Sequence, residues 1–160
     1  MRVIVTGGCG YIGSHVARAF TQHDAEVFVI DKERRQHTLK GIKHFRHDDF
    51  ASPGSLNLIK DYEPDYIVHC AGTSLVGPSI TNPGEYYDNN IAKTIQMLNA
   101  ISELPNRPTI MFSSSASTKH PNSIIYRSFV FTCCVSDTKI VYVYVFGTPC
   151  FLHKPSYFFK

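Results

Sequence analysis

The sequence contains no apolar run long enough to cross a membrane and no segment with the features of a secretory signal. Its first apolar run, residues 3–5, is short, and glycines follow it almost at once. We therefore expect a cytoplasmic protein without a membrane segment. With 160 residues, 43% of them hydrophobic and 18% charged, the chain is long enough for one globular domain with its own core.

Cysteine pairs spaced for a metal site or a disulfide framework are also missing. None of the cysteines forms a C-x-x-C pair, which favours reduced thiols. His44 and His47 stand beside two aspartates, but positions three apart on a strand face opposite sides of the sheet. We therefore expect no metal site. The cysteines are Cys9, Cys70, Cys133, Cys134 and Cys150.

A basic surface of the kind that binds nucleic acid is not indicated either. The net charge of +3 is unevenly divided, because residues 1–118 carry a net charge of −1 and residues 119–160 carry +4. The basic residues of the second part lack the interleaved aromatic residues of a nucleic-acid module. We expect no nucleic-acid partner.

What the chain does have is a glycine-rich segment between an apolar run and a helical pattern. Residues 6–13 read Thr-Gly-Gly-Cys-Gly-Tyr-Ile-Gly and fit both G-x-G-x-x-G and G-x-x-G-x-x-G spacings. Glycines permit a tight turn and let a pyrophosphate approach the backbone, and the following helix N-terminus offers free N–H groups. A glycine cluster alone also suits an ordinary turn, but here the context predicts a dinucleotide site.

The next apolar run supports this interpretation. Residues 27–30 end in Asp31, whose carboxylate is placed to accept hydrogen bonds from a ribose diol. Arg34 and Arg35 could instead bind the 2′-phosphate of NADP, but Asp31 would repel that phosphate. The expected cofactor is NAD.

Apolar runs and helical patterns alternate as far as residue 112. Strands are predicted at 3–5, 27–30, around 45, at 66–70 and at 109–112, and helices at 12–20, 56–61 and from Pro83 to about Ile101. This alternation indicates right-handed crossovers and a parallel sheet. The predicted fold is a three-layer, doubly wound α/β domain of Rossmann type.

The longest predicted helix has Asn82 as its N-cap and Pro83 at its first position. Its apolar stripe consists of Tyr87, Ile91, Thr94, Ile95, Leu98 and Ile101. His69, on the preceding strand, is either a catalytic residue or a buried histidine with satisfied hydrogen bonds, and the second alternative is favoured.

Taken in order, five motifs resemble the extended short-chain dehydrogenase/reductase family, and within it the NAD-dependent 4-epimerases of nucleotide sugars. The resemblance covers about residues 1–118. The double tyrosine with two asparagines favours the epimerases over the related dehydratases. The motifs occupy residues 6–15, 69–72, 76–79, 86–90 and 112–116.

The resemblance implies a role for each matching residue. The glycine turn would hold the pyrophosphate, Asp31 the adenosine ribose, and Asp49 with the Phe50 backbone the adenine. Ser115 matches the catalytic hydroxyl that hydrogen-bonds the sugar O4, and Ser74 replaces a frequent lysine. The implied cofactor residues are Gly7, Gly10, Tyr11, Ile12, Gly13, Asp31, Asp49, Phe50, Ala71, Gly72, Ser74, Asn90 and Ser113.

The family's catalytic Tyr-x-x-x-Lys is absent after Ser115. The tyrosines there, at 126, 142, 144 and 157, have no lysine four residues later. Residues 119–160 differ in composition from the rest, which favours an out-of-frame end, and residues 139–146 suit a further strand beside the strand at 109–112. Three alternatives stay open: an isomerase with another base, a non-catalytic NAD-binding module, and a defective gene product. A nucleotide-sugar substrate is implied, and a homodimer is compatible.

Overall fold

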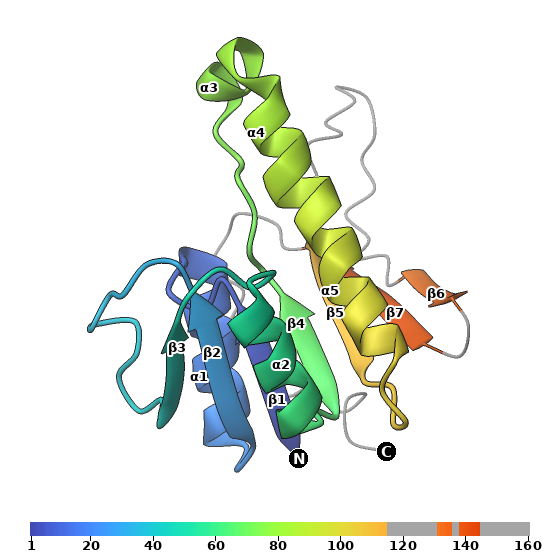
Figure 1. Ribbon diagram of the computed structural model, residues 1–160. Coiled ribbons are helices and arrows are strands. Elements are labelled where there is room, and N and C mark those ends of the chain that lie inside the picture. The colour runs from blue at the N-terminus through green and yellow to red at the C-terminus, as the bar shows by residue number, and fades with distance from the viewer. Residues whose placement is uncertain (115–130, 136–137, 145–160) are drawn as a thin grey trace, which may run out of the picture.

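A computed structural model describes residues 1–114, 131–135 and 138–144 of the chain (Figure 1). The described strands form one sheet in the order β3-β2-β1-β4-β5-β7-β6. Neighbouring strands run parallel except for β6 and β7, which are antiparallel. The order proceeds outward on both sides of β1, so the predicted doubly wound α/β fold is confirmed.

The strands and helices keep the order expected for crossover connections. The strands are β1 (Arg2–Thr6), β2 (Glu26–Asp31), β3 (His44–His47), β4 (Tyr66–His69), β5 (Thr109–Ser114), β6 (Phe131–Val135) and β7 (Thr138–Tyr144). The helices are α1 (Tyr11–Gln22), α2 (Pro53–Tyr62), α3 (Val76–Thr81), α4 (Pro83–Tyr87), the π-helical turn η1 (Asp88–Ala92) and α5 (Lys93–Ser102).

The sheet is covered on both faces because its central strands are apolar throughout. Alternate residues of β1 point to opposite sides: Ile4 packs with the cluster of α2 and α5, and Val3 and Val5 pack with the cluster of α1. Both clusters are fully buried at their centres. In Figure 1, α1 lies behind the sheet, and α2 and α5 lie in front of it.

The carboxyl ends of β1, β2, β4 and β5 meet at one edge of the sheet, where ligands bind in folds of this kind. The segments that leave this edge contain the glycine turn, the residues after Asp31, and the segment from Cys70 to α3. The continuous helical rod of α4, η1 and α5 extends beyond the same edge (Figure 1). The predicted cofactor residues are therefore concentrated there.

The long helix differs from its prediction in its first half. In the first half, Tyr87 and Ile91 are 65% and 51% exposed; in the second half, Ile95 is 51% exposed beside buried Thr94, whereas Met97 and Ala100, which the predicted stripe omitted, are buried. The reason is that the rod projects past the sheet, so its first turns have no layer to cover. Only its second half packs on the core, with Met97 and Ile101 at the centre.

The start of this helix is where the sequence predicts it, but its cap is different. Pro83 is the first residue of α4, and Asn82 precedes it without a hydrogen bond from its side chain to the helix backbone. Asn82 Nδ2 instead donates to Glu85 Oε2 over 2.9 Å. The short helix α3 before it was not predicted.

Beside β5 lies β7, whose residues Ile140 to Tyr144 pair in register with Ile110 to Ser114. Within the segment 119–160, the structure describes residues 131–135 and 138–144, and the others lie outside the described residues. No helix in the described part of the chain is long and apolar enough to cross a membrane.

Candidate dinucleotide site

The glycine turn after β1 is held in a tight conformation. Gly7 has a φ of +71°, a region that L side chains rarely adopt, and its carbonyl accepts the N–H of Gly10 over 3.1 Å. A Cβ on Gly7 would meet the Ala71 backbone nitrogen at 2.6 Å, and one on Gly13 would overlap the Gly7 carbonyl. The turn therefore packs against both its own helix and the loop after β4, as a close backbone cradle requires.

Helix α1 begins at Tyr11 with its N-terminus open. Its N-cap residue, Gly10, supplies no side chain to the first N–H groups, and no acidic residue lies in the first turn. Tyr11 is 78% exposed and Ile12 is half-buried. Free N–H groups and the positive end of the helix dipole at this point suit a pyrophosphate.

Asp31 links this turn to the loop that follows β2. Its Oδ2 accepts the N–H of Cys9 over 2.7 Å, and its Oδ1 accepts the N–H of Glu33 over 2.9 Å. Each oxygen keeps a further lone pair for a ribose hydroxyl. Arg35 donates from its Nε to Glu33 at 2.8 Å, so this arginine already has a carboxylate partner.

Asp49 forms ion pairs with two lysines. Its Oδ1 accepts the Ala51 N–H, and its Oδ2 lies 2.9 Å from the ammonium groups of both Lys32 and Lys93. Partial burial opposes ionisation, but these hydrogen bonds outweigh it and lower the pKa of Asp49 to about 2. Phe50 is 6% exposed and packs in the core.

The loop after β4 is fixed by the helical rod. Asn90 Oδ1 accepts the Thr73 N–H over 2.8 Å, and Asn90 Nδ2 donates to the Thr73 carbonyl over 2.9 Å. A Cβ on Gly72 would lie 3.2 Å from Asn90 Oδ1, so this loop passes close to the rod. Ala71 is half-buried and Ser74 is exposed. The predicted residues of this half thus lie together, with Asn90 bound to the loop.

Ser113 lies at the carboxyl end of β5, where its side chain hydrogen-bonds Cys70. Burial raises the pKa of the Cys70 thiol to about 11, and the bond to Ser113 offsets only part of that rise. Ser115, the predicted catalytic hydroxyl, lies outside the described residues, so its role stays a prediction.

The histidines of β3 and β4 have structural partners. His69 is 2% exposed, with Thr6 and Thr94 on its two ring nitrogens, which confirms the buried alternative. His47 bonds the Lys32 carbonyl, and His44 stacks on Phe28. Among the described residues, no three His, Cys, Asp or Glu side chains are grouped to hold a metal ion.

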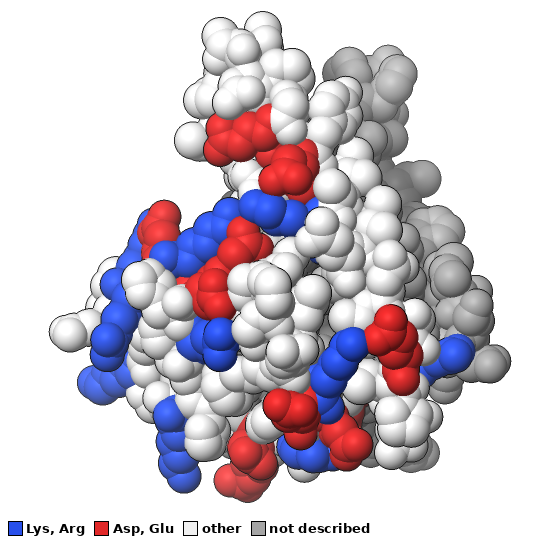
Figure 2. Space-filling view, in the orientation of Figure 1, with Lys and Arg blue, Asp and Glu red and all other residues white. Residues whose placement is uncertain are grey.

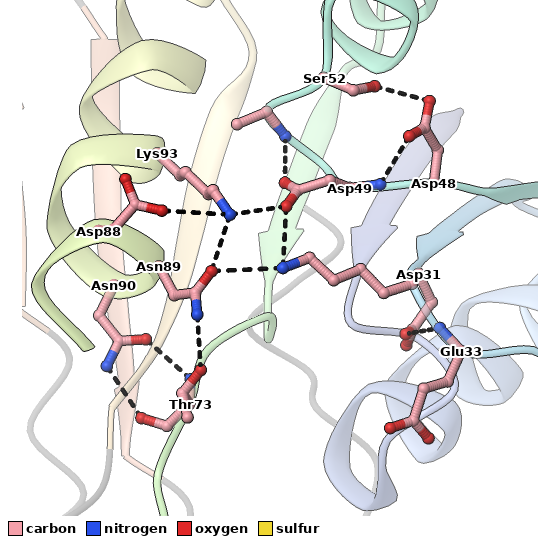
Figure 3. A network of polar contacts seen from close by, with 12 residues as sticks. Asp31, Glu33, Asp48, Asp49, Ser52, Thr73, Asp88, Asn89, Asn90 and Lys93 are labelled. Atoms are coloured by element: carbon pink, nitrogen blue, oxygen red, sulfur yellow. Dashed lines mark hydrogen bonds and ion pairs between the residues drawn. The ribbon is translucent and has the colours of Figure 1, made fainter. Parts of the chain in front are cut away.

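The sequence did not indicate four residues that organise the site: Lys32, which contacts Asp49, and Thr73, Asn89 and Lys93, which Figure 3 labels. The spacing of four between Asn89 and Lys93 would place them on one helix face. Lys32 and Asp49 come from separate strand ends, so only the tertiary structure shows that they meet. Figure 2 shows the basic and acidic side chains side by side between the body and the helical projection.

A glycine turn at an open helix N-terminus, with an acidic residue at the end of the neighbouring strand, defines a dinucleotide-binding α/β domain. Residues 3–125 match the sequence model of the NAD dependent epimerase/dehydratase family. The chain belongs to this family.

The proteins similar to this chain include UDP-glucose 4-epimerases. The enzyme of Halalkalibacterium halodurans is 36% identical over 121 residues, which are 74% of this chain and 36% of that enzyme. The enzyme of Stenotrophomonas maltophila, solved with NAD and formylated UDP-arabinopyranose, superposes with a TM-score of 0.65 at 31% identity, over 72% of this chain and 37% of that one. The Brucella ovis enzyme, solved with NAD, gives 0.64 at 30% identity, over 72% and 36%. This chain thus spans about a third of their length.

Proposed function

We propose that this chain is the NAD-binding portion of a UDP-glucose 4-epimerase-like protein. One observation carries the proposal: Asp31 accepts the Cys9 N–H of the glycine turn over 2.7 Å. This bond holds a ribose acceptor beside a pyrophosphate cradle, which is the arrangement that a dinucleotide requires. NAD in two similar solved epimerases supports the choice of cofactor.

The residues present fit NAD better than NADP. A 2′-phosphate would face the Asp31 carboxylate, and Arg35, which could compensate, is engaged by Glu33. The glycine turn and α1 would hold the pyrophosphate, Asp49 and the Phe50 backbone the adenine, and the loop from Ala71 to Ser74 the nicotinamide half. Bound NAD would supply a transient hydride acceptor for C4 of the sugar; this chain's residues bind and orient.

The proposed activity of the family is the interconversion of UDP-glucose and UDP-galactose. We do not assign this activity to these 160 residues alone. Ser115 would hydrogen-bond the sugar O4, but no Tyr-x-x-x-Lys follows it. We infer that residues 1–118 form the NAD-binding domain and that residues 119–160 are a divergent segment. A nucleotide sugar is the inferred substrate of the family member to which this portion belongs. The proposal is also compatible with a homodimer.

A second candidate function is a non-catalytic NAD-binding module, such as a sensor or assembly partner. The absence of the tyrosine and lysine pair favours it, because cofactor binding does not need that pair. A defective gene product is the third alternative. A Tyr-x-x-x-Lys in another frame of the adjoining DNA would support this third reading.

Calorimetric titration of the purified chain with NAD and NADP tests the proposal. We expect NAD to bind and NADP to bind at least tenfold more weakly, since the 2′-phosphate meets the Asp31 carboxylate. Folding is checked on the same sample by circular dichroism. No heat of binding from a folded sample, or equal affinity for the two dinucleotides, would overturn it.

A further inference from the structure

Asp49 lies at the centre of a charged cluster that joins three parts of the fold (Figure 3). Lys32 reaches it from the end of β2, and Lys93 reaches it from the start of α5; both ammonium groups lie 2.9 Å from the same oxygen, Oδ2. The other oxygen accepts the Ala51 N–H over 2.9 Å. Every polar contact of this carboxylate therefore fixes its direction.

Asn89 extends the cluster toward the other half of the site. Its Oδ1 accepts hydrogen bonds from Lys93 at 2.8 Å and Lys32 at 3.3 Å, while its Nδ2 donates to Thr73 Oγ1 at 3.3 Å. Asp88 lies 3.4 Å from the Lys93 ammonium. A continuous chain of polar contacts thus runs from Asp49 to the loop after β4.

The two lysines differ in how firmly they are held. The Lys93 side chain is 22% exposed and touches three oxygen-bearing groups, whereas the Lys32 side chain is 51% exposed. Exposed ion pairs contribute little, and partly buried charge-assisted bonds contribute more. We therefore expect Lys93 to be the stronger contact and Lys32 the weaker one.

The cluster lies at the edge of the sheet between two residues that are expected to contact the ligand. Lys32 follows Asp31, the ribose acceptor, and Asp49 precedes Phe50, whose backbone would meet the adenine. By joining the end of β2 to the helical rod, Lys32 and Lys93 border the region between these two ligand contacts. They are the only lysines that the described residues place against Asp49.

We propose that Lys32 and Lys93 act as a clamp on Asp49 that positions this carboxylate for the adenine end of the dinucleotide. The proposal rests on the proposed NAD-binding function and deepens it. Lys32 and Lys93 are positioning residues, because they act through Asp49 and the backbone beside it. Cofactor affinity in this chain then depends on two lysines outside the glycine turn.

The clamp also has a consequence for the protonation of Asp49. The charged groups that face it are Lys32, directly after β2, and Lys93 from α5, whose ammonium also lies 3.4 Å from Asp88; neighbouring Asp48 instead bonds Arg46 at 3.0 Å. These contacts keep the pKa of Asp49 near 2, although burial alone would raise it. Without both ammonium groups the pKa rises, so protonation begins at a higher pH and removes the acceptor.

Calorimetric titration of Lys93→Met, Lys32→Met and the double variant with NAD and ADP-ribose tests the clamp. We expect about a tenfold weaker Kd for Lys93→Met and about threefold for Lys32→Met. The loss should be equal for both ligands, because ADP-ribose retains the adenine end. Lys60→Met, which breaks an exposed pair with Glu103 away from the site, is the matched control and should stay within twofold.

A pH series separates positioning from a structural role. As the pH falls from 7 to 4, the ratio of the double variant's Kd to the wild-type Kd should grow, because Asp49 takes up a proton at a higher pH in the variant than in the wild type. Lys93→Arg should recover most of the lost affinity. A ratio that stays constant with pH, or affinity lost equally in Lys60→Met, would overturn the clamp.

The outcomes for the two proposals are distinct. Wild-type protein that is folded and does not bind NAD contradicts the proposed function itself. If the wild type binds NAD, and Lys93→Met and the double variant bind it equally tightly, only the clamp is contradicted. Thermal unfolding followed by circular dichroism, with every variant required to melt cooperatively, excludes loss of fold as the cause.

Discussion

His69 Nδ1 lies 2.7 Å from Thr6 Oγ1 in the interior of the sheet, and His69 Nε2 lies 3.3 Å from Thr94 Oγ1. The ring connects β4 to β1 on one side and to α5 on the other. Phe50 packs edge-on against it, with ring centroids 4.8 Å apart. His69 is therefore a buried polar residue that connects β1, β4 and α5 close to the edge of the sheet where the candidate site lies.

Acid should destabilise the protein through this residue. Burial lowers the pKa of His69 from 6.5 to about 4, so between these values the unfolded state binds a proton that the folded state does not. Stability is fully present above pH 6.5 and falls as the pH approaches 4, by about 3 kcal/mol in total. Urea unfolding at a series of pH values measures this slope.

The control for that slope is a pair of histidine variants. His69→Gln, although less stable at neutral pH, should lose much of the pH dependence between 6.5 and 4. His37→Gln, in an exposed position, should retain it. An unchanged slope in His69→Gln would show that other groups cause the acid sensitivity.

Gly13→Ala should abolish measurable NAD binding and destabilise the domain by about 1–3 kcal/mol, because the new methyl group overlaps the Gly7 carbonyl. Gly84→Ala is the matched control: it lies in α4, and a Cβ there meets nothing within 4 Å. This control should leave affinity intact and raise stability by up to about 1 kcal/mol. Urea unfolding and calorimetry give both quantities; equal behaviour of the two variants would contradict the packing seen at Gly13.

Asp31→Ala should weaken NAD by roughly ten- to a hundredfold, since a hydrogen bond to a charged group contributes on the order of 1.5–3 kcal/mol. NADP should be weakened less, so the preference for NAD narrows. Asp61→Ala, which removes an exposed carboxylate on α2, is the control. An unchanged ratio of NAD to NADP affinity in Asp31→Ala would argue against the ribose contact.

The 160-residue chain, incubated with NAD and UDP-galactose, should form no UDP-glucose at a useful rate. A positioned general base typically contributes a factor of about 10²–10⁴, and a serine hydroxyl such as Ser115 is no base near neutral pH. Chromatography of the nucleotide sugars measures the outcome. Turnover near one per second that Ser115→Ala or Tyr126→Phe abolishes would show that the chain retains the chemistry.

Sequence pattern predicted the sheet and the glycine turn well, for a physical reason. The central strands are buried on both faces and so consist of unbroken apolar runs such as residues 3–5 and 27–30, which few other structures tolerate. The turn is equally legible, because Gly7 has a backbone conformation that other residues rarely adopt. Local chemistry and tertiary structure agree in both places.

The helical rod was predicted less well because its environment changes along its length. An apolar period cannot show that Tyr87 and Ile91 stand beyond the sheet while Met97 packs beneath it. The lysine clamp was missed for a related reason. A lysine is most often solvated, and nothing near Lys32 or Lys93 in the sequence indicates that both lie against Asp49.

The π-helical turn makes the contacts of the rod depend on the number of residues in it. The Lys93 N–H donates to the Asp88 carbonyl, which closes a ring one residue wider than that of an α-helix. Deleting one residue between Tyr87 and Lys93 would restore a regular helix, and α4 would keep nearly the same rotation relative to α5, because a π-turn holds its extra residue within one wide turn. The deletion would remove the wide turn that carries Asn89 and Asn90, and with it the present geometry of their contacts with Thr73. An alignment gap of one residue at this place would then mark the family members in which the loop after β4 is held by a different contact.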